Sequence, residues 1–310
     1  MANGRQRPTS LLRAAERIER EQPALLADLS ARLFPRSQIA LDDASVASAR
    51  AILFTLVGQI EAELMGEDRG LSWPIVERNR LLDDPHMLWF LMAHAAFLRV
   101  SQRITAHDLR QSNAWLAGFA ADDETLVGQS ALDLLSARSR PSAYRLSGRL
   151  DLAAPLFRLA VQQVDAALHS LGVEGGNRRN EPRDLLTAHD EAKGLPHIAT
   201  KLAVQLAGEG AFGQLRQPRR VGLDLFAGSL AAELDCDWYA IVRIMTEGGP
   251  RLAIMLRAAD FDRDEAMALL ALFQRSEPPP EMSYYDEIAK DAARRLLPKR
   301  RAIPKGSGDA

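Results

Sequence analysis

Signals that begin and end helices recur along this 310-residue chain, and they constrain its fold more than any other feature. Asp84-Pro85 joins an N-cap residue to a proline suited to a first helical turn, and Gly248-Gly249-Pro250 ends one helix and begins the next. Between such signals, apolar residues follow the 3.6-residue period of a helix, as at Val46, Ala49, Leu53, Leu56, Val57, Ile60 and Leu64. No segment combines two-residue alternation with hairpin turns. The sequence therefore predicts an all-α fold with essentially no sheet.

Side-chain caps locate the expected helices. Thr105 and Asp108 have the spacing of a capping box. Asp262 and Glu265 repeat that spacing, and Asp122 is expected to cap the helix that follows it. With the apolar period, these signals predict helices over about residues 10–21, 23–35, 43–65, 85–98, 156–171, 223–234, 237–245 and 262–274. Short helices joined by tight turns predict antiparallel neighbours stacked as in HEAT-like repeats, although no clean repeating period is apparent.

Changes in amino-acid composition along the sequence predict its domains. Residues 175–182 contain no apolar side chain and begin with two adjacent glycines, which is typical of a linker, so we expect a linker over residues 173–182. We therefore expect an N-terminal helical domain over residues 1–172 and a C-terminal helical domain over 183–276. Residues 277–310 are expected to form a proline-rich linker, a short amphipathic helix and a basic tail.

Charge and hydropathy exclude several classes of partner. The formal net charge of −2 provides no global field that would attract nucleic acid or anionic lipid. The most apolar stretch, residues 87–98, is twelve residues long, whereas a membrane span needs about 20. Arg13, Glu16 and Arg17 interrupt the region where a secretory signal would need an apolar run. We expect a cytoplasmic protein with no nucleic-acid and no membrane partner.

The cysteine and histidine content does not favour a metal centre. Cys236 is the single cysteine, so neither an intramolecular disulfide nor a thiolate cluster can form. Its acidic neighbours should raise the pKa of the thiol instead of activating it. His86 and His94 are eight residues apart on one predicted helix, about 12 Å along its axis, too far to share a metal. His189 is expected on a solvated polar helix. We predict no metal and no cofactor.

Motifs of covalent and nucleotide chemistry are also missing. Ala227-Gly228-Ser229-Leu230 lacks the second glycine of a nucleophile elbow and falls within a helical stripe. Gly208, Gly210 and Gly213 follow a helix, whereas a dinucleotide-binding fingerprint follows a strand. The sequence favours a protein that is not an enzyme.

One short string could carry chemistry. Residues 105–111, Thr-Ala-His-Asp-Leu-Arg-Gln, resemble the phosphoacceptor box of sensor histidine kinases, in which an exposed His is followed by an acidic residue that can act as a base. His107 with Asp108 is the resulting candidate site. Ser112 replaces the proline of that box, and no glycine-rich ATP-binding box follows. The alternative interpretation is structural: both residues lie in the first turn of a helix, where Asp108 serves as a cap.

A resemblance to a known family rests on the C-terminal half. The residues that carry it lie at 215–217, 225–231, 248–259 and 261–272. They resemble an alphaproteobacterial family catalogued as domain of unknown function 2336, over roughly residues 213–273. The resemblance implies an all-helical bacterial protein of the cytoplasm with HEAT-like stacking. It implies no activity and no catalytic residue.

These observations favour one function and leave an alternative. Stacked short helices create extended grooves, and the chain offers no reaction chemistry. We expect a non-enzymatic protein-interaction or regulatory scaffold that binds a protein partner; partner identity and oligomeric state stay open. The alternative is a histidine phosphotransfer component that uses His107 as its phosphoacceptor.

Overall fold

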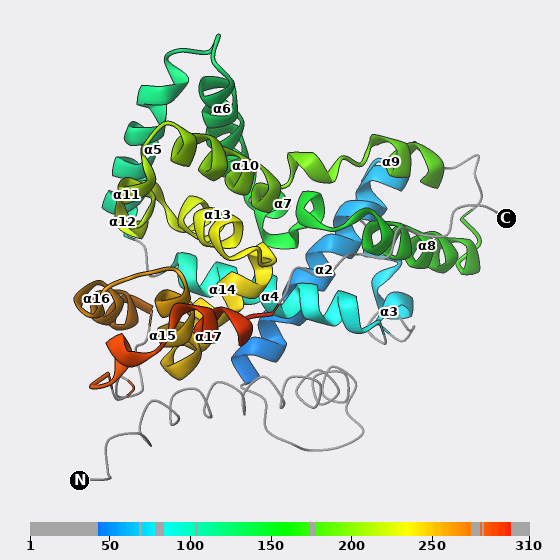
Figure 1. Cartoon of the computed structure of the whole chain (residues 1–310). Helices are drawn as coiled ribbons and strands as arrows, with labels where there is room; N and C mark the ends of the chain where they lie inside the picture. The colour runs from blue at the N-terminus through cyan, green and yellow to red at the C-terminus, as the bar shows by residue number, and fades with distance from the viewer. Residues whose placement is uncertain are drawn as a thin grey trace, which may run out of the picture. The chain divides into compact units, whose positions relative to one another are not determined.

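A computed structural model of the chain describes residues 43–67, 70–77, 84–102, 105–173, 178–273, 280 and 282–298 (Figure 1). Within these ranges the regular elements are sixteen α-helices, α2 to α17, and three short 3-10 helices, with no strand. The predicted all-α fold is therefore confirmed for the described residues. The helices expected over 10–21 and 23–35 and the basic tail lie outside them. None of the described helices is long and apolar enough to cross a membrane.

The chain forms two compact units, each assembled from separate stretches of sequence. Among the described residues, unit 1 comprises 96–132 and 199–298, and unit 2 comprises 43–95 and 133–198. The division falls within three helices: α4 (Pro85–Ser101), α6 (Leu126–Ser139) and α10 (Leu195–Gly208). This interleaved arrangement differs from the two sequential domains that we expected over residues 1–172 and 183–276.

The described end of the expected linker belongs to unit 2 and is anchored there. The backbone N–H groups of Arg179 and Asn180 donate to the carbonyl of Leu64, at 2.7 and 3.3 Å. The side-chain amide of Asn180 donates to the carbonyl of Glu63 at 2.7 Å. A polar, glycine-containing sequence can thus satisfy the last carbonyls of a helix as well as join two domains.

Unit 2 is built around the long helix α2 (Asp43–Met65). Packed against it are α3 (Trp73–Val76), α7 (Ser142–Ser147), α8 (Ala154–Ser170) and α9 (Pro182–Ala188). The 3-10 helices η2 (Arg149–Asp151) and η4 (Glu191–Lys193) contact each other. From Ala49 to Leu64 the predicted apolar stripe of α2 is its core face, since every member of it is buried, whereas Val46 is only half-buried.

Unit 1 contains most of the C-terminal helices. Its complete elements are α5 (Ala106–Ala120), α11 (Phe212–Leu215), α12 (Pro218–Val221), α13 (Leu223–Leu234), α14 (Trp238–Glu247), α15 (Gly249–Ala258), α16 (Arg263–Phe273), η5 (Tyr285–Glu287) and α17 (Lys290–Arg295). Helix α12 packs on α5, α13 packs on α14, and α15 contacts α16 and α17. Gly228 lets α13 approach α10 closely, since a Cβ there would lie 2.8 Å from the carbonyl of Ala199.

The end of the described chain is part of unit 1. The amphipathic helix expected after the proline-rich stretch is divided into η5 and α17. Tyr285 is fully buried, and its hydroxyl donates to the carbonyl of Phe261 at 3.2 Å. Arg257 on α15 donates to the carbonyl of Ile288 at 2.7 Å, and Arg294 on α17 donates to that of Ala258 at 3.2 Å. These arginines bring positive charge to the C-terminal end of α15, where the helix dipole favours it.

Most helix caps follow the predicted spacing. Thr105 with Asp108 forms a capping box, and Asp262 with Glu265 makes the same reciprocal hydrogen bonds. The expectation for Asp122 was wrong. Helix α6 begins four residues later, and its first turn is capped by Thr125, whose hydroxyl accepts from the N–H of Gly128 at 2.9 Å. An N-cap residue must lie directly before the first helical residue.

Candidate functional site

The predicted phosphoacceptor lies at the start of α5, and its side chain is exposed. His107 is the second residue of this helix, and Asp108 is the third. The carboxylate of Asp108 accepts hydrogen bonds from the hydroxyl of Thr105 at 2.7 Å and from its N–H at 3.1 Å. The hydroxyl bond lowers the pKa of Asp108, and the nearby guanidinium of Arg219 on α12 lowers it further.

The two residues of the candidate pair therefore serve different purposes. Asp108 is buried and bound to Thr105. Among the described interactions, no hydrogen bond joins it to His107. An acidic residue that activated an imidazole would have to reach a ring nitrogen. The structural interpretation of Asp108 as a cap is confirmed, and His107 is an accessible imidazole whose described interaction with Asp108 is one of charge alone.

A second group of ionisable side chains lies in unit 2 and was not recognised from the sequence. The ring of His189 stacks on that of Phe157 with centroids 4.1 Å apart. The guanidinium of Arg149 lies 5.1 Å from the centroid of the Phe157 ring. The carbonyl of Leu152 is 3.0 Å from Nε2 of His189, which must carry the proton to donate. Arg149 also forms an ion pair with Glu63 on α2. His189 is thus half-buried and packed, and the expected solvated position was wrong.

Burial controls the pKa values in this group. It lowers the pKa of His189, and the charge of Arg149 lowers it further. Burial also raises the pKa of Glu63, although Arg149 partly opposes that shift. Each group holds neighbouring elements together: Glu63 lies on α2, Arg149 on η2 and Phe157 on α8. Their contacts are those of a structural cluster.

Two further reactive side chains, those of His94 and Cys236, are also buried and engaged. His94 is buried within α4, where its Nε2 lies 2.8 Å from the carbonyl of Arg145 and its ring stacks on Phe90. Cys236 is buried, and burial, with the charges of Asp235 and Asp237, raises the pKa of its thiol to about 11. The thiol is therefore protonated at neutral pH. In the described part of the chain, no group of three His, Cys, Asp or Glu side chains could hold a metal ion.

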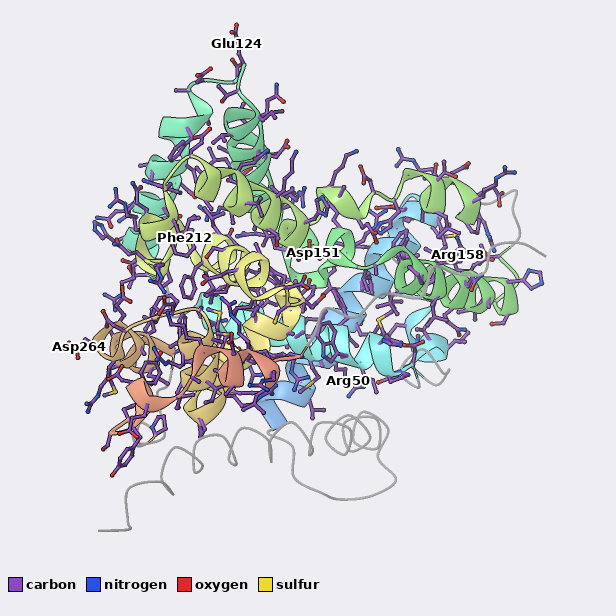
Figure 2. The ribbon with its side chains drawn as sticks, in the orientation of Figure 1. Arg50, Glu124, Asp151, Arg158, Phe212 and Asp264 are labelled. Atoms are coloured by element: carbon purple, nitrogen blue, oxygen red, sulfur yellow. The ribbon has the colours of Figure 1, made fainter. Side chains whose placement is uncertain are left out.

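An open apolar groove on unit 2 is the strongest candidate site. Its volume is about 530 Å³. Its walls come from the outer face of α2 and from α3, and the residues that line it are Val46, Ala47, Arg50, Ala51, Phe54 and Trp73. Phe54 is 48% exposed and meets Trp73 edge-on, with ring centroids 5.2 Å apart. Arg50, which Figure 2 labels, forms an ion pair with Glu77 at the rim.

The groove arises from a second apolar stripe on α2. Ala47, Ala51 and Phe54 follow one another at intervals of four and three residues, so they share one helical face. Ala49, Leu53 and the buried residues that follow them in the first stripe are turned into the core of unit 2. Sequence reasoning accounted only for that inner stripe. The signal of the outer stripe was present, but two alanines in a helix are equally typical of a solvated surface.

Comparison of the chain with protein-family models, with curated proteins and with solved structures found no significant match in any of the three. The groove is therefore interpreted from its geometry and chemistry.

Proposed function

We propose that this is a non-enzymatic, cytoplasmic interaction or regulatory protein whose α2–α3 groove binds an amphipathic helix of a partner protein. One observation carries the proposal: Phe54 and Trp73 form an aromatic wall that is open to solvent beside two alanines of α2. Buried aromatic anchors dominate the energetics of most protein interfaces. Phe54 differs from the other exposed apolar residues in that it faces a second aromatic ring across a groove.

The shape of the groove favours a helix as the bound element. Ala47 and Ala51 have the smallest side chains that a helix face can offer short of glycine, so another backbone can approach α2 to the short end of the usual interaxial range of about 8–10 Å. Large apolar side chains of the incoming helix would fill the space beside Phe54. Burying the exposed half of Phe54 would itself contribute about 2 kcal/mol. Arg50 and Glu77 at the rim would stay hydrated.

Titration with a designed peptide tests the proposal. The probe is an amphipathic helical peptide with leucines at i, i+4 and i+8, and its affinity is measured by calorimetry. We expect Phe54→Asp to weaken binding by at least about 30-fold, corresponding to about 2 kcal/mol. The matched control is Leu171→Asp, because Leu171 lies in the same unit and is also 48% exposed. Equal affinities for both variants would contradict the proposal.

Membership of the alphaproteobacterial family is a separate proposal. The residues that carry the resemblance, 213–273, correspond to the consecutive helices α11 to α16 of unit 1. Gly228, at the close approach of α13 to α10, gives one of its small residues a structural role. HEAT-like stacking of these helices belongs to the same proposal.

Phosphotransfer through His107 remains a second candidate function. The exposure of the imidazole at the start of α5 favours it, because a phosphoryl donor must reach the ring. The engagement of Asp108 in the capping box argues for the interaction role instead.

A further inference from the structure

We propose that a basic patch on unit 1 binds an acidic segment of a protein partner. The basic patch consists of four exposed residues, His107 and Arg110 on α5 and Arg219 and Arg220 on α12. The proposed function concerns the α2–α3 groove, which belongs to unit 2, so the basic patch is a second surface that rests on different observations.

The packing of α11 and α12 along α5 brings the four residues to one end of α5. Further along α5, the indole N–H of Trp115 donates to the side-chain carbonyl of Gln214 on α11 at 2.8 Å. In the first turn of α5, Asp108 lies close enough to Arg219 on α12 for the guanidinium to lower the pKa of its carboxyl. The chain of α11 and α12 therefore runs antiparallel to α5 and carries its arginines to the N-terminal end of that helix.

The basic side chains of both helices are turned to solvent. Helix α12 packs on α5, and its first and last residues, Pro218 and Val221, are buried, whereas the two arginines between them are exposed. On α5, His107 and Arg110 are three residues apart, so they share one face of the helix. The free N–H groups at the start of this 15-residue helix add partial positive charge at the same place.

The chain itself does little to neutralise this positive charge. Residues 105–120 and 210–223 contain four arginines and a single acidic residue, Asp108. The carboxylate of Asp108 is held in the capping box by Thr105. In the part of the chain that the structure describes, no hydrogen bond or ion pair engages the guanidinium groups of the basic patch. Because an arginine can donate two parallel hydrogen bonds to a carboxylate, these groups are suited to Asp or Glu side chains of a partner.

The surroundings of the basic patch favour a protein over a nucleic acid. Residues 107–111 and 217–220 contain no aromatic ring on which a base could stack. Leu109 lies between His107 and Arg110 and is 44% exposed. A protein segment that carries several carboxylates and one apolar side chain would match both the charge of the patch and this leucine.

Fluorescence anisotropy with the full-length chain and an acidic peptide tests the proposal. The probe is a short labelled peptide of glutamate and serine, which has no apolar side chain to enter the α2–α3 groove. We expect Arg219→Glu with Arg220→Glu to weaken binding by at least about tenfold, because each reversed charge replaces an attraction with a repulsion. The matched control is Arg158→Glu with Arg183→Glu. These two arginines are also exposed, lie in unit 2, where Figure 2 labels Arg158, and change the net charge by the same amount.

Further measurements separate a local effect from a general one. Arg219→Gln with Arg220→Gln removes the charges without reversing them, so it should weaken binding to a smaller extent, and it decides the test if the reversed pair does not fold. Raising the salt concentration from about 50 to about 500 mM should weaken binding of the peptide to the wild type, because exposed charges are screened.

Equal affinities of the reversed pair and of its control would overturn the proposal. So would a single-stranded RNA oligomer or phosphatidylserine vesicles that bind more tightly than the peptide through the same two arginines. Phe54→Asp should leave binding of the acidic peptide unchanged. If the acidic peptide does not bind while the leucine peptide still binds in a Phe54-dependent manner, the proposal fails here and the proposed function stands.

Discussion

The hydroxyl of Thr105 donates a hydrogen bond to the carboxylate of Asp108 and accepts one from its backbone N–H. These two hydrogen bonds determine how His107, the residue before Asp108, is interpreted. We predict that Thr105→Ala lowers the free energy of unfolding by about 1 kcal/mol, the usual cost of removing an N-cap. His107→Gln should change it by less than about 0.5 kcal/mol, because the imidazole is exposed. Urea denaturation measures both. A loss of several kcal/mol in His107→Gln would mean that the imidazole is buried.

The variant His107→Gln also tests the second candidate function, phosphotransfer. Acid-labile phosphate that appears on the wild type after incubation with a phosphoryl donor, and not on His107→Gln, would replace the interaction role with phosphotransfer. We expect neither protein to be labelled, since Asp108 is occupied by Thr105.

Burial of two histidines, His94 and His189, makes the free energy of unfolding depend on pH. Burial lowers the folded-state pKa of His94 and of His189 below the unfolded value of about 6.5. Their contribution is therefore complete above that pH and is lost as the pH falls through the folded values. The free energy of unfolding should drop below pH 6.5 by up to about 1.4 kcal/mol per pH unit for each histidine.

Denaturation at a series of pH values between about 5 and 7.5 checks this prediction, since that range brackets the unfolded pKa of histidine. His189→Gln removes one titrating group and keeps a side-chain N–H that can donate to the carbonyl of Leu152. The variant should lose less stability on acidification than the wild type. An unchanged pH dependence would show that His189 is not held neutral by burial.

At the scale of single helices, α2 shows how far a sequence pattern reaches. Its buried face from Ala49 onward was predicted from one apolar period and is confirmed, and the helix ends at Met65, as expected. The outer stripe was not recognised, since exposure depends on what packs nearby and not on the helix itself. The groove appears only when Trp73, from a four-residue helix, is placed against Phe54.

Helix α13 provides a prediction at the same scale. Gly228→Ala would place a methyl group 2.8 Å from the carbonyl of Ala199 on α10, closer than backbone atoms allow. We expect a loss of about 1–3 kcal/mol. Gly118→Ala is the matched control, because it also replaces a glycine within a helix of unit 1 and meets nothing within 4 Å. It should gain up to about 1 kcal/mol. Thermal or urea unfolding distinguishes them, and equal effects would contradict the close approach.

At the scale of the whole molecule, the sequence predicted the fold class but not the grouping of helices. Fold class follows from local signals, which repeat along the chain. Grouping depends on contacts between distant residues, such as Asn180 with Glu63 in unit 2 and Gln214 with Trp115 in unit 1. Short apolar stripes of similar composition do not specify which other helix of the chain each one packs against. His189 was misplaced for the same reason, since its stacking partner Phe157 is 32 positions away in the sequence.

The measurement that tests the proposed function most directly is the fluorine resonance of Trp73 in protein labelled with 5-fluorotryptophan. The chain has four tryptophans, and Trp73→Phe assigns the signal by its loss. If the groove binds an amphipathic helix, adding the designed leucine peptide shifts the Trp73 resonance and leaves the signals of tryptophans outside the groove, such as Trp115, in place. Saturable binding of the peptide with an unchanged Trp73 resonance would contradict the account.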